Sequence, residues 1–125
     1  MPTVLTEGRH PGEFIMTEAN GQRSRESVTI PASQSFEPNT VLARLGSAGS
    51  YTYVPFNQDG VDGSEAAFCV AIYGAETGAA ETVDITAIVR DAEVNGNCLA
   101  WPSDIEAAEI DAAVVQLNAN GIIVR

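Results

Sequence analysis

Basic residues are scarce in this chain, and lysine is absent. Six arginines face 17 aspartates and glutamates, which gives a formal net charge of -11 at pH 7. Because such a surface repels phosphate groups, the sequence argues against binding to nucleic acid or to an anionic membrane. The excess lies in the second half, since five acids face four arginines up to residue 58 and twelve face two afterwards. We interpret it mainly as a solvated acidic exterior.

Histidine is almost absent, which limits the available catalytic chemistry. The only histidine, His10, is followed by Pro11 and Gly12. A segment of this kind is poorly suited to holding a general base in one orientation. The sequence also lacks a Gly-x-Ser-x-Gly motif, a Gly-x-x-x-x-Gly-Lys phosphate loop and a Cys-x-x-Cys pair. We therefore predict that the protein is not an enzyme and uses no cofactor.

Only two cysteines occur, and both lie among apolar residues. Cys69 belongs to the apolar run 66–73, and Cys98 precedes Leu99, Ala100 and Trp101. Such thiols usually behave as small hydrophobic side chains, so we expect buried, reduced cysteines. A disulfide between them remains an alternative because spacing alone does not decide it.

Long apolar runs are also missing. No segment approaches the roughly 20 residues of a membrane span, and no apolar stretch typical of a targeting sequence follows Met1. A chain of 125 residues with 45% hydrophobic residues is sufficient for one globular core. We expect a single domain made in the cytoplasm, without a membrane partner.

One loop is rich in oxygen ligands. Residues 57–65 include Asp59, Asp62 and Glu65, which suit calcium in principle. Counted from Asn57, however, the sixth position, which must be glycine in an EF-hand loop, is Asp62. We interpret the loop as an acidic turn and predict no metal site, with calcium binding as the alternative.

Several short segments have the composition of β-strands. Residues 27–30 predict the first ordered strand, which ends at Pro31. Residues 40–45 and 51–56 flank a Gly/Ser loop and predict a hairpin. Residues 66–73 predict a buried strand.

A second hairpin is predicted at Asn95-Gly96. This dipeptide is the strongest signal for a two-residue turn, because both positions tolerate a positive φ. The extended runs on either side cover residues 82–94 and 97–101.

The best-defined helix is predicted at residues 104–119. A capping box, Ser103-Asp-Ile-Glu106, precedes it, and Asn120-Gly121 ends it before a short strand at 122–124. We expect one apolar stripe made of Ile105, Ala108, Ala112 and Val115, with Ile110, Val114 and Leu117 beside it. The predicted fold class is α+β: a small β-rich single domain with hairpins and one C-terminal amphipathic helix.

The start of the chain predicts an extended N-terminal arm. Phe14, Ile15 and Met16 form a small apolar island between Pro11-Gly12 and the turn signal Asn20-Gly21. Neither a helix nor a long strand can pass through both breaks. Such an arm needs another surface to bury its apolar side chains. We expect an arm and junction at 1–26 and a body at 27–125.

Tyr51 and Tyr53 alternate on one predicted strand face. Packing in the core or at a subunit interface is the main interpretation. A ligand platform is the alternative, and it would make the protein an acidic, soluble, β-rich binding module of a bacterium that recognises a small ligand or a protein.

Seven blocks of sequence, in order over nearly the whole chain, resemble the head decoration protein family of tailed phages, typified by the lambda head protein D. The blocks are Glu7-Gly-Arg-His10, Gly12-Glu-Phe14, Glu18-Ala-Asn-Gly21, Ser24-Arg-Glu26, Ala87-Ile-Val-Arg-Asp-Ala-Glu-Val-Asn-Gly96, Trp101-Pro102 and Gly121-Ile-Ile-Val-Arg125. The arm pattern looks like that of the longer family members, and the two cysteines are not family features.

The resemblance implies a structural protein of the virion. It implies a homotrimer that sits on the outside of the expanded head, at three-fold and local three-fold positions, and stabilises the shell of major capsid protein. It also implies an N-terminal arm that becomes ordered on that shell. The capsid-binding residues that we expect on this basis are Thr3, Val4, Leu5, Arg9, His10, Pro11, Gly12, Phe14, Ile15 and Met16.

Overall fold

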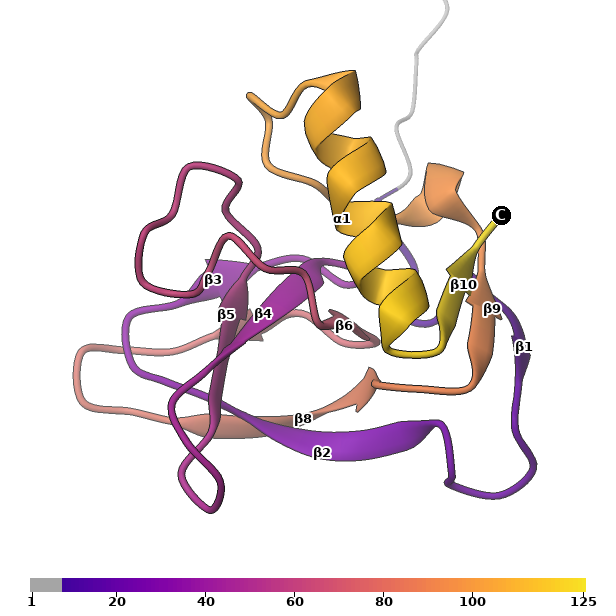
Figure 1. Cartoon of the computed structure of the whole chain (residues 1–125). Coiled ribbons are helices and arrows are strands. Elements are labelled where there is room, and N and C mark those ends of the chain that lie inside the picture. Colours follow the sequence, from indigo (N-terminus) through magenta and orange to yellow (C-terminus); the bar gives the residue numbers. More distant parts are fainter. Residues whose placement is uncertain (1–7) are drawn as a thin grey trace, which may run out of the picture.

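The computed structural model describes residues 8–125 and shows a small β-rich domain with one C-terminal helix (Figure 1). This agrees with the predicted fold class. The strands are β1 (Ile15–Glu18), β2 (Arg25–Ile30), β3 (Ser35–Phe36), β4 (Val41–Leu45), β5 (Thr52–Pro55), β6 (Cys69–Ala71), β7 (Ala75–Glu76), β8 (Val83–Ile88), β9 (Ala92–Val94) and β10 (Ile122–Val124). The helices are the 3-10 turn η1 (Gly96–Cys98) and α1 (Ala107–Ala119). Within this part of the chain, no helix has the length and apolar character needed to cross a bilayer.

The largest sheet contains five antiparallel strands in the order β2-β8-β6-β4-β5. Its two edge strands, β2 and β5, approach each other, so the sheet curls towards a barrel. In β2, Val28 and Ile30 are buried while Ser27 is exposed, which is the alternation expected of a strand with one face on the core. The predicted hairpin at 40–56 is confirmed as β4 and β5.

A three-stranded sheet joins the two ends of the described chain. Its order is β1-β9-β10, with β9 in the middle, antiparallel to β1 and parallel to β10. Thus Ala92 of β9 lies opposite Glu18 on one side and opposite Ile122 on the other. The first strand is therefore β1, not the segment at 27–30 as predicted.

The predicted hairpin at Asn95-Gly96 is wrong. Asn95 has φ -85° and ψ 110°, and its side chain accepts a hydrogen bond from the Asn97 N–H at the start of η1. No two-residue turn forms because both sides of β9 are already paired, and the preceding strand, β8, belongs to the other sheet. Gly96 serves close packing instead, since a Cβ there would lie 3.0 Å from Cγ1 of Val124.

Helix α1 begins three residues later than predicted. Residues 102–105 form a turn, in which the Ile105 N–H donates to the Pro102 carbonyl. The cap is Glu106, whose N–H donates to Oε1 of Glu109 at 2.9 Å, so the capping box is not at Ser103. The end of the helix follows the prediction, because Gly121 has φ +85° and β10 starts directly after it.

The predicted apolar side of α1 is only partly buried. The fully buried residues of the helix are Ala113 and Leu117, and Ile110 and Val114 are half-buried beside them. Of the predicted stripe, Ala108, Ala112 and Val115 are exposed, whereas Ile105, just before the helix, packs against the core. Both stripes have helical spacing, so periodicity alone did not distinguish them.

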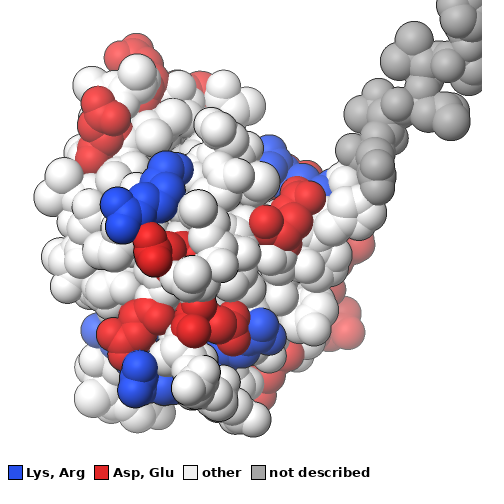
Figure 2. All heavy atoms as spheres, turned by 90° about the vertical axis from the view of Figure 1, so that its right-hand side faces the viewer, with Lys and Arg blue, Asp and Glu red and all other residues white. Residues whose placement is uncertain are grey.

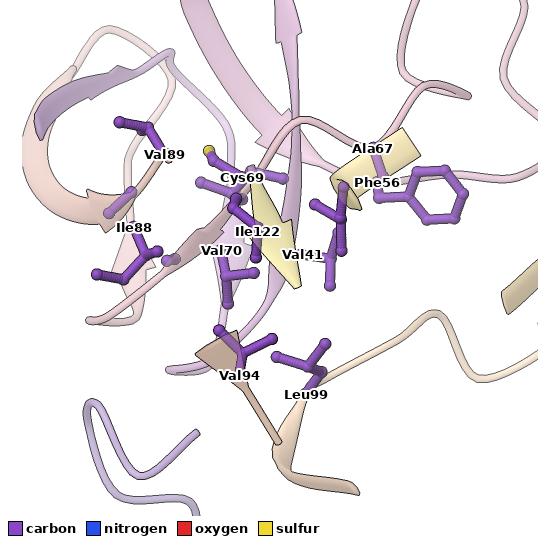
Figure 3. Close-up of a cluster of buried hydrophobic side chains, with 14 of the residues drawn as sticks. Val41, Phe56, Ala67, Cys69, Val70, Ile88, Val89, Val94, Leu99 and Ile122 are labelled. Carbon is purple, nitrogen blue, oxygen red and sulfur yellow. The ribbon is translucent and has the colours of Figure 1, made fainter. Parts of the chain in front are cut away.

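One hydrophobic core joins the two larger sheets and the helix. Figure 3 shows Val41 and Val70 of the five-stranded sheet in one cluster with Val94 and Ile122 of the three-stranded sheet. Leu117 of α1 belongs to the same core. Because the core includes residues from β1 to β10, the described chain folds as one unit.

Candidate functional site

Phe14, placed by the sequence in a docking arm, is part of the core. Its side chain is 0% exposed, and its carbonyl accepts a hydrogen bond from the Asn95 N–H at 2.7 Å. The expectation that the apolar island lacks a core of its own is therefore wrong for this residue. The segment is short, but it is covered by the body across β1 and β9.

Arg9 ties the start of the described chain to the body. Its Nε donates to Oε1 of Glu37 at 3.0 Å, and its Nη1 donates to the Cys98 carbonyl at 2.9 Å. The two partners lie far apart in the sequence, before β4 and at the end of η1. A guanidinium that bridges two segments in this way fixes the position of the chain at residue 9.

Asn39 provides a second attachment for the same segment. It is 0% exposed and has φ +70°, a conformation that asparagine tolerates better than most residues. Its Nδ2 donates to the His10 carbonyl at 3.2 Å and to Oε1 of Glu13 at 3.1 Å. Residues 9–13 are thus held by Arg9 and Asn39 together.

The other predicted capsid-binding residues divide into two groups. His10, Pro11 and Met16 are exposed, and Arg9, Gly12 and Ile15 are half-buried. Of these residues, only Arg9 and His10 line a shallow groove of about 510 Å³, together with Gly8, Glu13 and Glu37. Thr3, Val4 and Leu5 lie outside the described residues.

Strand β1 is the edge of its sheet, so among the described residues only one of its sides is paired with another strand. An open edge offers N–H and C=O groups to a further strand. On the neighbouring strand β9, the Glu93 carboxylate links β1 to the residue that follows β10. It accepts from Thr17 Oγ1 at 3.0 Å and from Arg125 Nε at 2.8 Å. The Arg125 guanidinium and the Thr17 hydroxyl hold the pKa of Glu93 below its usual range.

The arginines lie almost entirely in ion pairs. Within residues 8–125 the pairs are Arg9–Glu37, Arg23–Asp91, Arg25–Glu18, Arg90–Glu26 and Arg125–Glu93. Figure 2 shows the same mixture on one face of the molecule, where blue arginine atoms lie beside red carboxylates. The surface is therefore acidic overall, but its positive charges are locally neutralised.

The acidic loop at 57–65 is an ordinary turn. The Asp62 carboxylate accepts from the Ser64 hydroxyl at 2.6 Å and from its N–H at 3.2 Å, and these bonds lower the pKa of Asp62. Gly63 and Asp59 make similar local bonds to Glu65 and Asn57. No cluster of three or more potential metal ligands occurs in the described part of the chain.

The cysteines and tyrosines have structural roles. Both cysteines are free, and burial raises the pKa of Cys69, so its thiol stays protonated. Cys98 is only half-buried, contrary to the prediction. Tyr53 is 6% exposed and burial raises its pKa, which argues against the ligand platform predicted with Tyr51.

These features define a structural protein: a β-rich body with a firmly held N-terminal segment, an open strand edge and an acidic surface. The family model described as bacteriophage lambda head decoration protein D matches residues 4–122. The chain belongs to this family. No curated protein matches it. It is accordingly a non-enzymatic capsid decoration protein, located on the exterior of the virion capsid.

Sequence reasoning missed the residues that hold the N-terminal segment. They are Glu37 and Asn39, which lie 26 to 29 residues from their partners in the chain, and Glu13, which is one of the partners of Asn39. The only signal was Asn39 itself, because a residue between Pro38 and Thr40 that tolerates a positive φ suggests a special backbone position.

Proposed function

We propose that the chain binds as a homotrimer to the outside of the expanded phage head. Its positions are the three-fold and local three-fold axes, and its partner is the major capsid protein. The segment 1–26 acts as the arm and junction, and the segment 27–125 acts as the body. Membership of the decoration protein family supports stabilisation of the shell as the role of this binding.

The observation that carries the docking proposal is the fixed base of the arm beside an open strand edge. Arg9 and Asn39 hold the segment directly before β1, and β1 leaves one side unpaired among residues 8–125. In our proposal Thr3, Val4 and Leu5 contact the shell, together with Arg9, His10, Pro11, Gly12, Ile15 and Met16 at the base. Phe14 supports this surface from within the core.

The energetics favour three arms acting together. Ordering a residue costs roughly 1 to 2 kcal/mol of conformational free energy, so one short arm binds weakly. In a trimer the second and third contacts become intramolecular, which raises the overall affinity by a factor of roughly 100 to 10,000. Weak single contacts thus suffice for stable decoration.

Deletion of residues 2–8 tests the docking proposal. This deletion ends before Arg9, so it leaves Phe14 and β1 in place, whereas a deletion up to Met16 would remove a core side chain. We expect an unchanged unfolding temperature and the loss of binding to expanded heads, measured by co-sedimentation. A matched variant, V4S/L5S, keeps the length of the arm and removes only its apolar contacts.

Two results would contradict the proposal in different ways. If the deletion variant binds heads as tightly as the unaltered protein, the arm does not dock. If images of decorated heads show the protein away from the three-fold axes or in another stoichiometry, the proposed trimer is wrong, whatever the arm does.

A further inference from the structure

Arg44 differs from every other described arginine. The other five have a carboxylate oxygen within 3.3 Å, whereas Arg44 has none within 4.0 Å among residues 8–125. In a chain with 17 acidic residues, the lack of a carboxylate beside one exposed arginine needs an explanation. Arg44 lies on β4, next to the turn that leads into β5.

The Arg44 guanidinium lies against two aromatic rings. Its central carbon lies 4.0 Å from the centroid of the Tyr51 ring and 4.0 Å from that of Phe68. Contacts of this kind leave the N–H groups of a guanidinium available to hydrogen-bond acceptors. One such acceptor is the Tyr53 hydroxyl, which is hydrogen-bonded to Arg44. A guanidinium is a planar donor fork, which is the geometry that a carboxylate accepts with two hydrogen bonds.

The surface beside Arg44 is small and apolar. A hollow of about 300 Å³ is lined by Arg44, Phe68, Ala67 and, from the end of the helix, Gln116, Ala119 and Asn120. Ala119 continues into the outer stripe of α1, which consists of Ala108, Ala112 and Val115. Val115 is 66% exposed. Helix α1 is thus apolar on its outer side as well as on its core side.

We propose that Arg44, held between Tyr51 and Phe68, binds a carboxylate of a second copy of this chain. This contact, bordered by the outer stripe of α1, is part of the interface between copies. The inference rests on the trimer of the proposed function. Charge complementarity supports this occupant, because every copy carries an excess of carboxylates and presents, among residues 8–125, this one guanidinium without a carboxylate partner.

The position of Arg44 favours a second copy over the shell. The hollow beside Arg44 shares no lining residue with the groove at the base of the arm, which is lined by Gly8, Arg9, His10, Glu13 and Glu37. A neighbouring copy can therefore contact Arg44 without displacing the base of the arm.

The test is a binding titration of R44Q on expanded heads that lack decoration protein. R90Q is the matched control, because it removes the same charge from an exposed arginine that is paired within its own chain. We expect R44Q to raise the half-saturating concentration about tenfold and to reduce the Hill coefficient towards that of independent binding. R90Q should overlay the unaltered protein. R44K, which keeps the charge but not the planar fork, should lie between them.

The outcomes separate this inference from the proposed function. If the unaltered protein binds cooperatively and R44Q matches it, the Arg44 contact is wrong and the trimer stands. A tenfold shift with an unchanged Hill coefficient would assign Arg44 to the shell and overturn the inference. If the unaltered protein binds as independent single copies, the trimer itself is wrong. Unfolding curves of the variants exclude a folding defect as the cause.

Discussion

Phe14 is buried although its short, interrupted segment predicts no core contact. The outer stripe of α1 is exposed although its helical spacing predicts a buried contact. Phe14 lies in a short apolar island with a break on each side, yet it is 0% exposed. Ala108, Ala112 and Val115 lie in a regular helical stripe, yet they face outwards. The difference shows that apolar spacing predicts a buried contact without identifying its partner. For Phe14 the partner is the protein's own body, and for the helix stripe we propose a second copy.

The largest effect is expected from Phe14→Ala. Loss of a fully buried phenylalanine costs about 3 to 5 kcal/mol of unfolding free energy, because a cavity remains in the core. Denaturant unfolding measures this loss. The control is Met16→Ala two residues later, which is 55% exposed and should change stability by less than about 0.5 kcal/mol. Equal effects of the two changes would show that Phe14 does not belong to the core.

The two sides of α1 provide the next comparison. Leu117→Ala should cost about 2 to 5 kcal/mol, because Leu117 is 0% exposed in the core. Val115→Ala, on the outer stripe, should stay within about 0.5 kcal/mol in the isolated chain. Thermal unfolding at low protein concentration measures both. A large loss with Val115→Ala alone would mean that the helix is turned the other way.

The smallest effect concerns the carboxylate that joins β1, β9 and β10. The pKa of Glu93 lies below its ordinary value of about 4.5, because the charged form is stabilised in the folded state. Its contribution is therefore complete above that pH and is lost as the pH falls through the folded-state value. Glu93→Gln should lower stability at pH 7 and reduce its dependence on pH below 4.5.

Glu76→Gln is the matched control, since Glu76 is an exposed glutamate without an arginine partner among the described residues. Unfolding measured from pH 3 to pH 7 distinguishes the two variants. If Glu93→Gln and Glu76→Gln give the same pH profile, the bonds from Arg125 and Thr17 do not stabilise the sheet.

Local signals in the sequence predicted local structure well. The hairpin of β4 and β5, the stop at Gly121 and the strand β10 follow from turn residues and composition within a few positions. The resemblance of ordered blocks predicted the family. These features depend on neighbouring residues, whose preferences are visible in one short window.

Features that depend on distant partners were not predictable. Asn95-Gly96 has the composition of a hairpin turn, but β9 is already paired on both sides, so the turn had no strand to join. Phe14 is buried because β9 lies beside it, and Arg9 is held by Glu37 and by the Cys98 carbonyl. A single sequence contains no signal for such long-range pairings.

The placement of β9 between β1 and β10 has a consequence for how the chain folds during synthesis. The partners of this strand are the first and the last strand of the described chain, so the small sheet cannot be completed before residues 122–124 have left the ribosome. Pairings between ends so far apart form slowly because a long loop must close first. The base of the arm needs partners up to Cys98, so it cannot take its final position before β9 and η1 have been made.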